Sequence, residues 1–485
     1  MLLIYGSLGF PDAWRAISFA YAIFVILTVV VVVAERREPV KSLAWIMVIA
    51  MFPVGGMILF FIFGRNLHKR HLFTPQESLW EGLSEGEMAE PMGALAECPD
   101  LSESAHSLIN LMHHNSHAPL ALRNRVEILN NGNECFPRMF EDMSRAQHSL
   151  HIEFFGIESG ALFEEMFAVL AERVARGVEV RIIYDSIGGR RFHRRDIRRL
   201  RRAGVNVRCF LPIFSARYMG LLNYRNHRKI VVVDGKVAYT GGMNIADRYR
   251  YGVRGGILRD VHLRVEGEAV AMLQRVFVTD WAFVTEGELL NDECYFPPAT
   301  IRQLCPVQIA TSGPDSLYPS IQHSYFAAIG KARRYVYIST PYLLPDNAIL
   351  SALTVAALGG VDVRVLIPVR GDNVVVAWAS YSYVDTLLAA GVRVYLYRNG
   401  FNHSKFIVVD DELCTVGSAN LDYRSFNDDF EVQALLYDRS ITCHLREIFL
   451  ADLADSEEIT SEGWQRRSRT SKLMEPVARL LAPLF

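Results

Sequence analysis

The chain has 485 residues, of which 51% are hydrophobic, so it can form two domains of ordinary size together with membrane segments. Its formal net charge of -2 argues against a nucleic-acid-binding protein, because such proteins usually carry a basic excess. The seven cysteines include no Cys-x-x-Cys pair, which indicates reduced thiols and a reducing compartment around the part of the chain that holds them.

Two apolar stretches near the start of the chain are typical of a membrane hairpin. Residues 17–34 carry no charge, and at about 1.5 Å per residue a helix of this length reaches roughly 27 Å, close to the hydrocarbon thickness. After a short polar turn, residues 43–64 are again uncharged, although Pro53 and two glycines interrupt them. A cleaved signal peptide fits less well, because a second apolar span follows at once. We therefore expect a transmembrane helical hairpin over residues 1–65.

The basic residues around the hairpin bear on its orientation. Three lie in the turn and four on the outer flanks: Arg36, Arg37 and Lys41 against Arg15, Arg65, Lys69 and Arg70. This count slightly favours a topology with both ends in the cytoplasm. Residues 66–118 read as a polar connector. Three histidines lie there, His113, His114 and His117, but no cysteine or carboxylate cluster accompanies them, so we expect no metal site.

The remainder of the chain divides into two similar halves, expected as domains over residues 119–296 and 297–485. Three segments of the first half match segments of the second at separations of 185, 183 and 187 residues: 149–154 with 334–339, 177–183 with 360–366, and 203–207 with 390–394. Such regular spacing indicates an internal repeat. Apolar strands alternate with helical stretches in each half, which predicts an α/β domain whose sheet is covered by helices.

Each half contains a His-x-Lys motif that is followed by Asp and, after a turn of small residues, by Asn. The first copy holds His227, Lys229, Asp234 and Asn244, and the second holds His403, Lys405, Asp410 and Asn420. Because the whole chain has only seven lysines, chance is a poor explanation of two copies. A buried strand with a polar lead-in would explain one copy, but not two with matching residues downstream.

The spacing within the motif suits phosphate chemistry. In a strand, residues at i and i+2 project to the same side, so the imidazole and the ammonium of one motif lie together. Neutral His can attack phosphorus or shuttle a proton, and Lys offers a compact positive charge to phosphate oxygens. If the halves pack about a pseudo-twofold axis, the two motifs meet in one shared cleft.

The paired motifs resemble those of the phospholipase D superfamily, and in detail those of bacterial cardiolipin synthases of the two-motif type. The segments that carry the resemblance are 223–229, 239–245, 259–267, 340–342 and 420–425. The resemblance implies two pseudo-twofold-related phospholipase D-like α/β/α domains after the hairpin, with no cofactor. It also implies a multi-pass protein of the bacterial inner membrane, with its catalytic domains in the cytoplasm.

Phosphodiester exchange without a metal needs a nucleophile, a proton donor and positive groups around phosphorus, and the repeat supplies each in duplicate. By analogy with the superfamily, His227 is the expected nucleophile and His403 the acid and base. The lysines and the two asparagines are expected to hold phosphoryl oxygens. Asp260 and Glu431 occupy matching places and are expected to orient the imidazoles. Asp234 and Asp410 fit the stabilisation of the turn after each strand better than contact with substrate.

The expected function is that of a membrane phosphatidyltransferase, which joins two phosphatidylglycerol molecules into cardiolipin and releases glycerol through a phosphohistidine. A phospholipase D hydrolase or a phosphatidylserine synthase would differ only in the acceptor, and a membrane-tethered nuclease is disfavoured by the acidity of the chain. Two basic segments are candidates for contact with anionic lipids, although a solvated helix face explains the first equally well: residues 190–202 and the amphipathic tail 464–485. Residues 210–224, rich in Phe, Tyr, Met and Leu, line an acyl-chain entrance or belong to the core.

Overall fold

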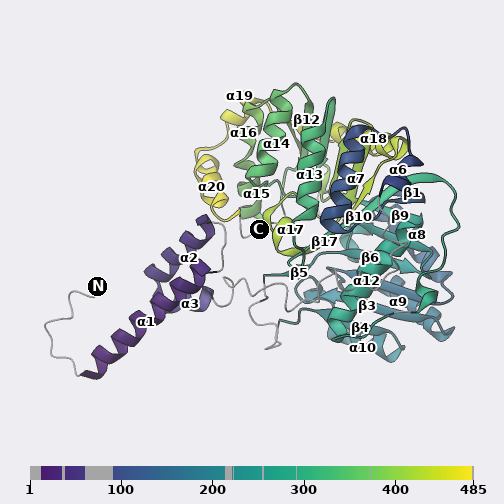
Figure 1. Cartoon of the computed structure of the whole chain (residues 1–485), viewed down its shortest axis with the longest axis horizontal. Helices are drawn as coiled ribbons and strands as arrows, with labels where there is room; N and C mark the ends of the chain where they lie inside the picture. Colours follow the sequence, from purple (N-terminus) through teal and green to yellow (C-terminus); the bar gives the residue numbers. More distant parts are fainter. Residues whose placement is uncertain are drawn as a thin grey trace. The chain divides into compact units, whose positions relative to one another are not determined.

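The computed structural model describes residues 12–34, 39–60, 91–213, 221, 223–253, 256–290, 292–371 and 373–482 (Figure 1). The chain forms two compact units. The smaller comprises residues 1–72 and 213–223, and the larger comprises residues 73–212 and 224–485.

Helices α1 (Asp12–Ala34), α2 (Pro39–Met51) and α3 (Pro53–Leu59) make up the described part of the smaller unit. Met57 on α3 is buried and accepts a hydrogen bond from Thr28 on α1, whereas Phe19 and Val33 are 69% and 61% exposed. Among the described residues, we find no helix that is both long enough and apolar enough to cross a membrane. The spans expected at 17–34 and 43–64 remain predictions, and residues 61–64 lie outside the described part.

In the larger unit, two helices precede the first half and a series of short elements builds it. The order is α6 (Pro91–Ala96), α7 (Glu103–Ser116), β1 (Ala121–Asn130), α8 (Asn131–Ser144), β2 (Ser149–Phe154), α9 (Ala161–Ala175), β3 (Glu179–Asp185), η3 (Gly188–Arg191), α10 (Arg194–Arg202), β4 (Asn206–Phe210), β5 (Arg225–Asn226), β6 (Lys229–Val233), β7 (Val237–Gly241), α11 (Asp247–Tyr251), β8 (Ile257–Arg259), β9 (Val261–Gly267), α12 (Ala269–Thr285) and η5 (Glu293–Tyr295).

The second half repeats much of this order. It consists of β10 (Leu304–Ser312), α13 (Ser320–Lys331), β11 (Tyr335–Ser339), α14 (Asn347–Leu358), β12 (Asp362–Pro368), α15 (Val374–Tyr381), α16 (Val384–Ala389), β13 (Arg393–Tyr397), β14 (Gly400–Asn402), β15 (Phe406–Val409), β16 (Leu413–Gly417), α17 (Tyr423–Asn427), β17 (Asp429–Leu436), α18 (Arg439–Ala454), β18 (Ser456–Glu458), α19 (Ser461–Gln465) and α20 (Arg469–Arg479).

One mixed sheet runs through both halves of the described larger unit. Its strand order is β18-β13-β12-β11-β15-β16-β17-β10-β1-β9-β7-β6-β2-β3-β4, with β5 paired to β17 outside this path. The halves meet at the antiparallel pair β1 and β10. β6 begins with the motif lysine of the first half and pairs antiparallel with β2, and β15 follows the lysine of the second half and pairs antiparallel with β11. β2 and β11 are each the first strand of the parallel part of the sheet. The expectation of two similar α/β domains is confirmed.

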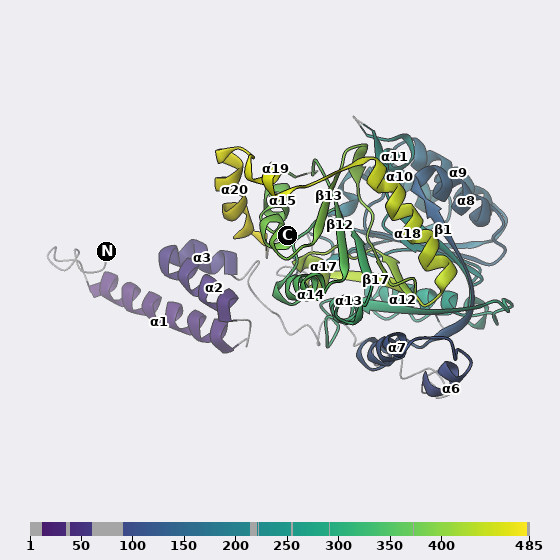
Figure 2. The same ribbon diagram turned by 90° about the horizontal axis from the view of Figure 1, so that it is seen from above.

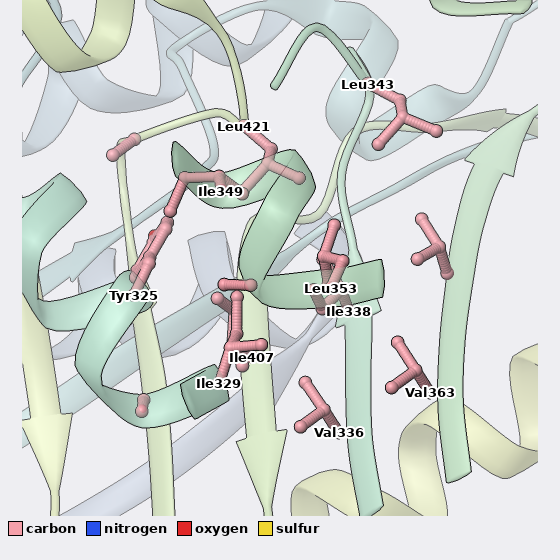
Figure 3. Packing of buried hydrophobic residues seen from close by; sticks show 14 of the residues in the cluster. Tyr325, Ile329, Val336, Ile338, Leu343, Ile349, Leu353, Val363, Ile407 and Leu421 are labelled. Carbon is pink, nitrogen blue, oxygen red and sulfur yellow. The ribbon is translucent and has the colours of Figure 1, made fainter. Parts of the chain in front are cut away.

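Helices cover both faces of the sheet, which explains why the motif strands are continuous apolar runs. On β6, Ile230 and Val232 pack beneath α12, while Val231 and Val233 face α8 and α9. Residues of β15 alternate in the same way between α18 and the layer of α13 and α14. Figure 3 shows Ile407 of β15 in the second of these layers, among the side chains of α13, α14, β11 and β12. Figure 2 shows α18 running across the strands of the second half.

Helix α7 belongs to the core of the second half, although it precedes the first half in sequence. Leu108, Ile109 and Met112 are buried against α13 and β10, and Ser102 caps its first turn through the N–H of Ala105. Residues 66–90 of the expected polar connector lie outside the described residues.

Candidate active site

Two very short parallel strand pairs bring each motif histidine next to the opposite half of the repeat. β5, which pairs with β17, ends directly before His227. β14, which pairs with β8, ends directly before His403. Since paired parallel strands advance together, the next residue on the partner strand lies beside each histidine. That residue is Glu431 for the first motif and Asp260 for the second.

His227 is bound through one ring nitrogen to Glu431. Nδ1 lies 2.9 Å from Oε1 and 3.1 Å from Oε2, and the main-chain N–H of His227 donates to the carbonyl of Phe430 at 2.9 Å. A carboxylate only accepts, so Nδ1 carries the proton and Nε2 keeps its lone pair. Burial lowers the pKa of His227, which keeps the ring neutral. Burial by itself would raise the pKa of Glu431. The pKa is nevertheless below its usual value, because the carboxylate is stabilised by His227, Lys229 and the Ser418 hydroxyl.

His403 has the matching arrangement with Asp260, whose Oδ2 lies 2.8 Å from Nδ1. The hydroxyl of Tyr249 is 3.2 Å from the same nitrogen, and the ammonium of Lys405 lies near both ring nitrogens, at 2.7 and 3.2 Å. Burial, followed by the charges of Lys405 and Lys229, lowers the pKa of His403 well below 6.5. Burial raises the pKa of Asp260 to about 6. The second imidazole is therefore also neutral in the protein alone.

The two carboxylates differ in their support. Ser418 donates a hydrogen bond to Glu431 from its hydroxyl. The equivalent residue of the first half is Gly242, where a Cβ atom would lie 2.1 Å from Oδ1 of Asp260. The shorter aspartate side chain thus draws its carboxyl against the backbone, and glycine is required there by close approach.

The asparagine before each histidine fixes the bend at the end of its lead-in strand. Asn226 accepts the N–H two residues ahead at 3.0 Å, and its side-chain amide donates to Glu153. Asn402 accepts the equivalent N–H at 3.2 Å and donates to Ser339 at 2.8 Å. These local turns hold the backbone from which each imidazole projects.

Both imidazoles line one cavity of about 980 Å³ between the halves. Its charged lining contains five arginines and two aspartates: Arg225, Arg248, Arg370, Arg398, Arg424, Asp422 and Asp429. Its apolar lining includes Phe155, Ile187, Leu258, Leu344, Val369, Val376 and Phe401. A space of this kind fits an anionic group attached to apolar chains.

Asn244 and Asn420 also line this cavity, but their side chains are held differently. Oδ1 of Asn244 accepts the N–H of Gly156 at 3.0 Å, and Nδ2 donates to Tyr249 at 3.3 Å. Ser425 stands in the second half where the first has Tyr249, and its hydroxyl accepts only the main-chain N–H of Asn420, at 3.1 Å. Oδ1 of Asn420 is buried without a partner among the described residues. This carboxamide is the less constrained of the two.

The lysines and the motif aspartates are not among the described residues that line the cavity. Lys229 and Lys405 each donate to the carbonyl of their own histidine, and burial lowers the pKa of Lys229 to about 7. Asp234 accepts the main-chain N–H groups of residues 147–149 at 2.7 to 2.9 Å. Asp410 does the same for residues 333–335, at 2.7 to 2.8 Å. Asp234 thus links the end of β6 to the start of β2, and Asp410 links the end of β15 to the start of β11.

Several residues of the site had no role in the sequence interpretation. Tyr249 contacts His403, and Ser418 contacts Glu431. The two lead-in asparagines hold the main chain around each histidine, and Arg225 and Arg424 bring charge to the cavity. The sequence repeat could have indicated some of these residues. Asn precedes both motif histidines, and Arg248 and Arg424 occupy the same position in the two halves.

The sequence and the fold were compared with known proteins. A model described as "Cardiolipin synthase, PLD-like domain" matches residues 139–281 and 325–453, and one described as "Phospholipase_D-nuclease N-terminal" matches residues 20–65. Among solved structures, the phosphatidylserine synthase of Haemophilus influenzae Rd KW20 has a TM-score of 0.55 at 12% identity, covering 77% of this chain and 96% of its own. The fold and the twice-occurring site thus define a protein with two phospholipase D-like domains.

Full-length relatives narrow this class. The cardiolipin synthase of Geobacillus sp. (strain WCH70) is 37% identical, over 98% of this chain and 96% of its own length. The major cardiolipin synthase of Bacillus subtilis (strain 168) is 36% identical, over 97% and 98%. The chain belongs to the cardiolipin synthase family of phospholipase D-like enzymes.

Proposed function

We propose that this chain is a membrane phosphatidyltransferase that converts two phosphatidylglycerol molecules into cardiolipin and glycerol. The observation that carries the proposal is the pair of imidazoles in one cavity, each bound through Nδ1 to a carboxylate of the opposite half. Such a pair provides a nucleophile and a proton-transfer group that face the same phosphorus.

In the first step, Nε2 of His227 attacks the phosphorus of one phosphatidylglycerol. The N–P bond forms as the P–O bond to the terminal glycerol breaks, and the departing alkoxide takes a proton from Nε2 of protonated His403. Because Nδ1 already donates to Glu431, the attacking nitrogen keeps its lone pair and the cation that develops on the ring is stabilised.

In the second step, the other phosphatidylglycerol supplies a hydroxyl. His403, now neutral, takes its proton while the oxygen attacks phosphorus, and the N–P bond to His227 breaks. The products are cardiolipin and an enzyme ready for another cycle. Water in place of this hydroxyl would give phosphatidic acid, so the acceptor alone separates a synthase from a hydrolase.

The charge of the substrate couples binding to this chemistry. The protein alone holds His403 neutral through burial and two nearby ammonium groups. A phosphodiester anion bound in the cavity next to His403 partly offsets this positive charge and raises the pKa of His403, so the acid form is favoured once substrate is bound. Asn244, Asn420, Arg248 and Arg424 line the same cavity and are the proposed contacts of the phosphoryl oxygens.

The lipid substrate agrees with the surface of the smaller unit. Several large apolar side chains of its described helices are more than half exposed, including Phe19, Ile26, Leu27, Val33, Met47 and Val54. We propose that residues 1–65 attach the enzyme to the bacterial inner membrane as the expected hairpin, with the catalytic domains in the cytoplasm, so that donor and acceptor lipid share one two-dimensional phase.

The test is product analysis with purified full-length protein in detergent and phosphatidylglycerol labelled in its terminal glycerol. The expected products are cardiolipin and labelled free glycerol in equal amounts. His227→Ala and His403→Ala are each expected to abolish turnover. Phosphatidic acid as the main lipid product would support a hydrolase, and near-normal activity of either single mutant would contradict the shared-site mechanism.

A further inference from the structure

Two segments at equivalent places in the repeat each contribute residues to the cavity lining. In the first half, Ile187 lines the cavity and leads directly into η3 and α10. In the second half, Val369, Arg370 and Asn373 line it and lead into α15, on which Val376 is also a lining residue. Both segments follow corresponding strands, β3 and β12. We call them the first lip and the second lip.

The first lip is strongly basic. Its exposed arginines are Arg190, Arg191, Arg194, Arg195, Arg198, Arg201 and Arg202. Only some of this charge is neutralised within the described protein: Arg191 lies 3.5 Å from Glu158, and Arg195 lies 3.6 Å from Asp196. A chain with a formal net charge of -2 therefore concentrates positive charge beside its cavity.

Beside the second lip, α20 packs against α15 and presents an aliphatic stripe to solvent. Leu473, Val477, Leu480 and Leu481 follow the i, i+4, i+7, i+8 spacing of one helix face and are 68%, 49%, 79% and 41% exposed. Val374, the first residue of α15, is 58% exposed. Figures 1 and 2 both show α20 next to α15.

The opposite face of α20 fixes this stripe in position. Glu475 and Ala478 are buried, and Glu475 accepts from Arg467 at 3.0 Å. The guanidinium of Arg479 lies 4.2 Å from the ring centroid of Tyr383, between α15 and α16. Since the helix is held on one side by these contacts, the aliphatic stripe is a stable surface feature. Arg469 and Lys472 are exposed on the same helix.

We propose that the two lips together form a docking surface for an anionic phospholipid bilayer, which presents headgroups to the cavity mouth. The arginines of the first lip meet the negative headgroup layer, and the stripe of α20 enters the boundary between headgroups and acyl chains. Charge complementarity and the position beside a cavity that holds two imidazoles select a bilayer over another protein. The inference rests on the proposed function for its lipid substrate.

The first experiment compares two presentations of phosphatidylglycerol to the full-length enzyme: vesicles, and a short-chain form below its critical micelle concentration. Leu473→Gln with Leu480→Gln is expected to lower the vesicle rate by at least about tenfold and leave the monomer rate within about twofold. Val355→Gln with Leu358→Gln on α14, at 67% and 72% exposure, is the matched control and is expected to change neither rate. Loss on both substrates, or on neither, would overturn the proposal.

The first lip is tested in the same assay by Arg194→Gln with Arg195→Gln. The vesicle rate is expected to fall several-fold at low salt, and the difference from wild type is expected to disappear at high salt as screening removes the attraction. Arg145→Gln with Arg176→Gln removes the same charge elsewhere in the first half and is expected to have no effect. Equal loss in both double mutants would show a net-charge effect and contradict docking by the lip.

A second measurement does not depend on turnover. Tryptophan fluorescence of Val477→Trp is expected to be quenched by vesicles of brominated phosphatidylglycerol beyond the background of the six native tryptophans, whereas Val355→Trp is expected to match that background. No extra quenching at position 477 would refute the proposal and indicate that a second copy or another part of this chain covers the stripe. An enzyme inactive on both lipid forms would refute the proposed function, while quenching would still report docking.

Discussion

The hydrogen bond between His227 and Glu431 allows a sharp prediction about the nucleophile. Glu431→Gln keeps the size of the side chain but removes the negative charge and supplies an amide that can donate. If the amide donates to Nδ1, the imidazole proton moves to Nε2, and the atom that should attack phosphorus loses its lone pair. Formation of the phosphohistidine is then slowed without any change in the cavity lining.

The magnitude follows from the geometry. Nδ1 lies 2.9 Å from a fully buried carboxylate, and a hydrogen bond to a charged group contributes about 1.5 to 3 kcal/mol, or roughly 10- to 150-fold in rate. The wrong tautomer adds to this, since the equivalent Asp-to-Asn change in a catalytic triad costs about 10⁴-fold. We expect the rate of phosphohistidine formation to fall by about 10² to 10⁴, with KM changed little.

Rapid quenching of enzyme mixed with phosphorus-labelled phosphatidylglycerol measures this step as acid-labile label on the protein. Ser418→Gly is the companion variant, because it introduces the residue of the first half and removes one donor from a carboxylate that remains charged. It is expected to slow the step by no more than about tenfold. A loss below about tenfold for Glu431→Gln, in a variant with wild-type thermal stability, would refute the role assigned to this carboxylate.

Three further outcomes are expected. Because burial lowers the pKa of Lys229 to about 7, this ammonium loses its charge as pH rises above 7, so kcat/KM should fall there, and Lys229→Arg should remove that decline; a profile unchanged by the substitution would contradict it. Asp410→Ala leaves the N–H groups of residues 333–335 without their acceptor and should lower the free energy of unfolding by about 2 to 4 kcal/mol in thermal melts, with kcat of the folded fraction preserved. Tyr249→Phe should reduce kcat by roughly tenfold through loss of the hydroxyl beside His403, and an unaltered kcat would place that hydroxyl outside the mechanism.

The sequence was most informative where chemistry and periodicity coincide. Two His-x-Lys motifs before fully apolar strands indicated a duplicated α/β domain, and the runs after each lysine are indeed buried on both faces. The histidines and asparagines of both motifs line one cavity. Because these patterns are local in sequence, they can be recognised without knowledge of tertiary contacts.

What the sequence could not give depends on contacts between distant segments. β5 has two residues and β14 has three, too few for any periodic pattern, yet their pairing decides which carboxylate meets which imidazole. Helix α7 was interpreted as a polar connector because only one face of it is apolar, and that face packs against α13 and β10, about 200 residues away. The free carboxamide of Asn420 depends on Ser425 being too short to reach it, which no spacing rule contains.

The crossed strand pairs have a consequence for how the protein is made. His227 is synthesised 204 residues before Glu431, the carboxylate that contacts it. His403 is synthesised after its own partner, Asp260. In the proposed mechanism, a chain that ends before Glu431 therefore lacks the carboxylate that orients the nucleophile His227. The proposed phosphoryl transfer thus requires both halves of the chain, because each half supplies the carboxylate for the histidine of the other.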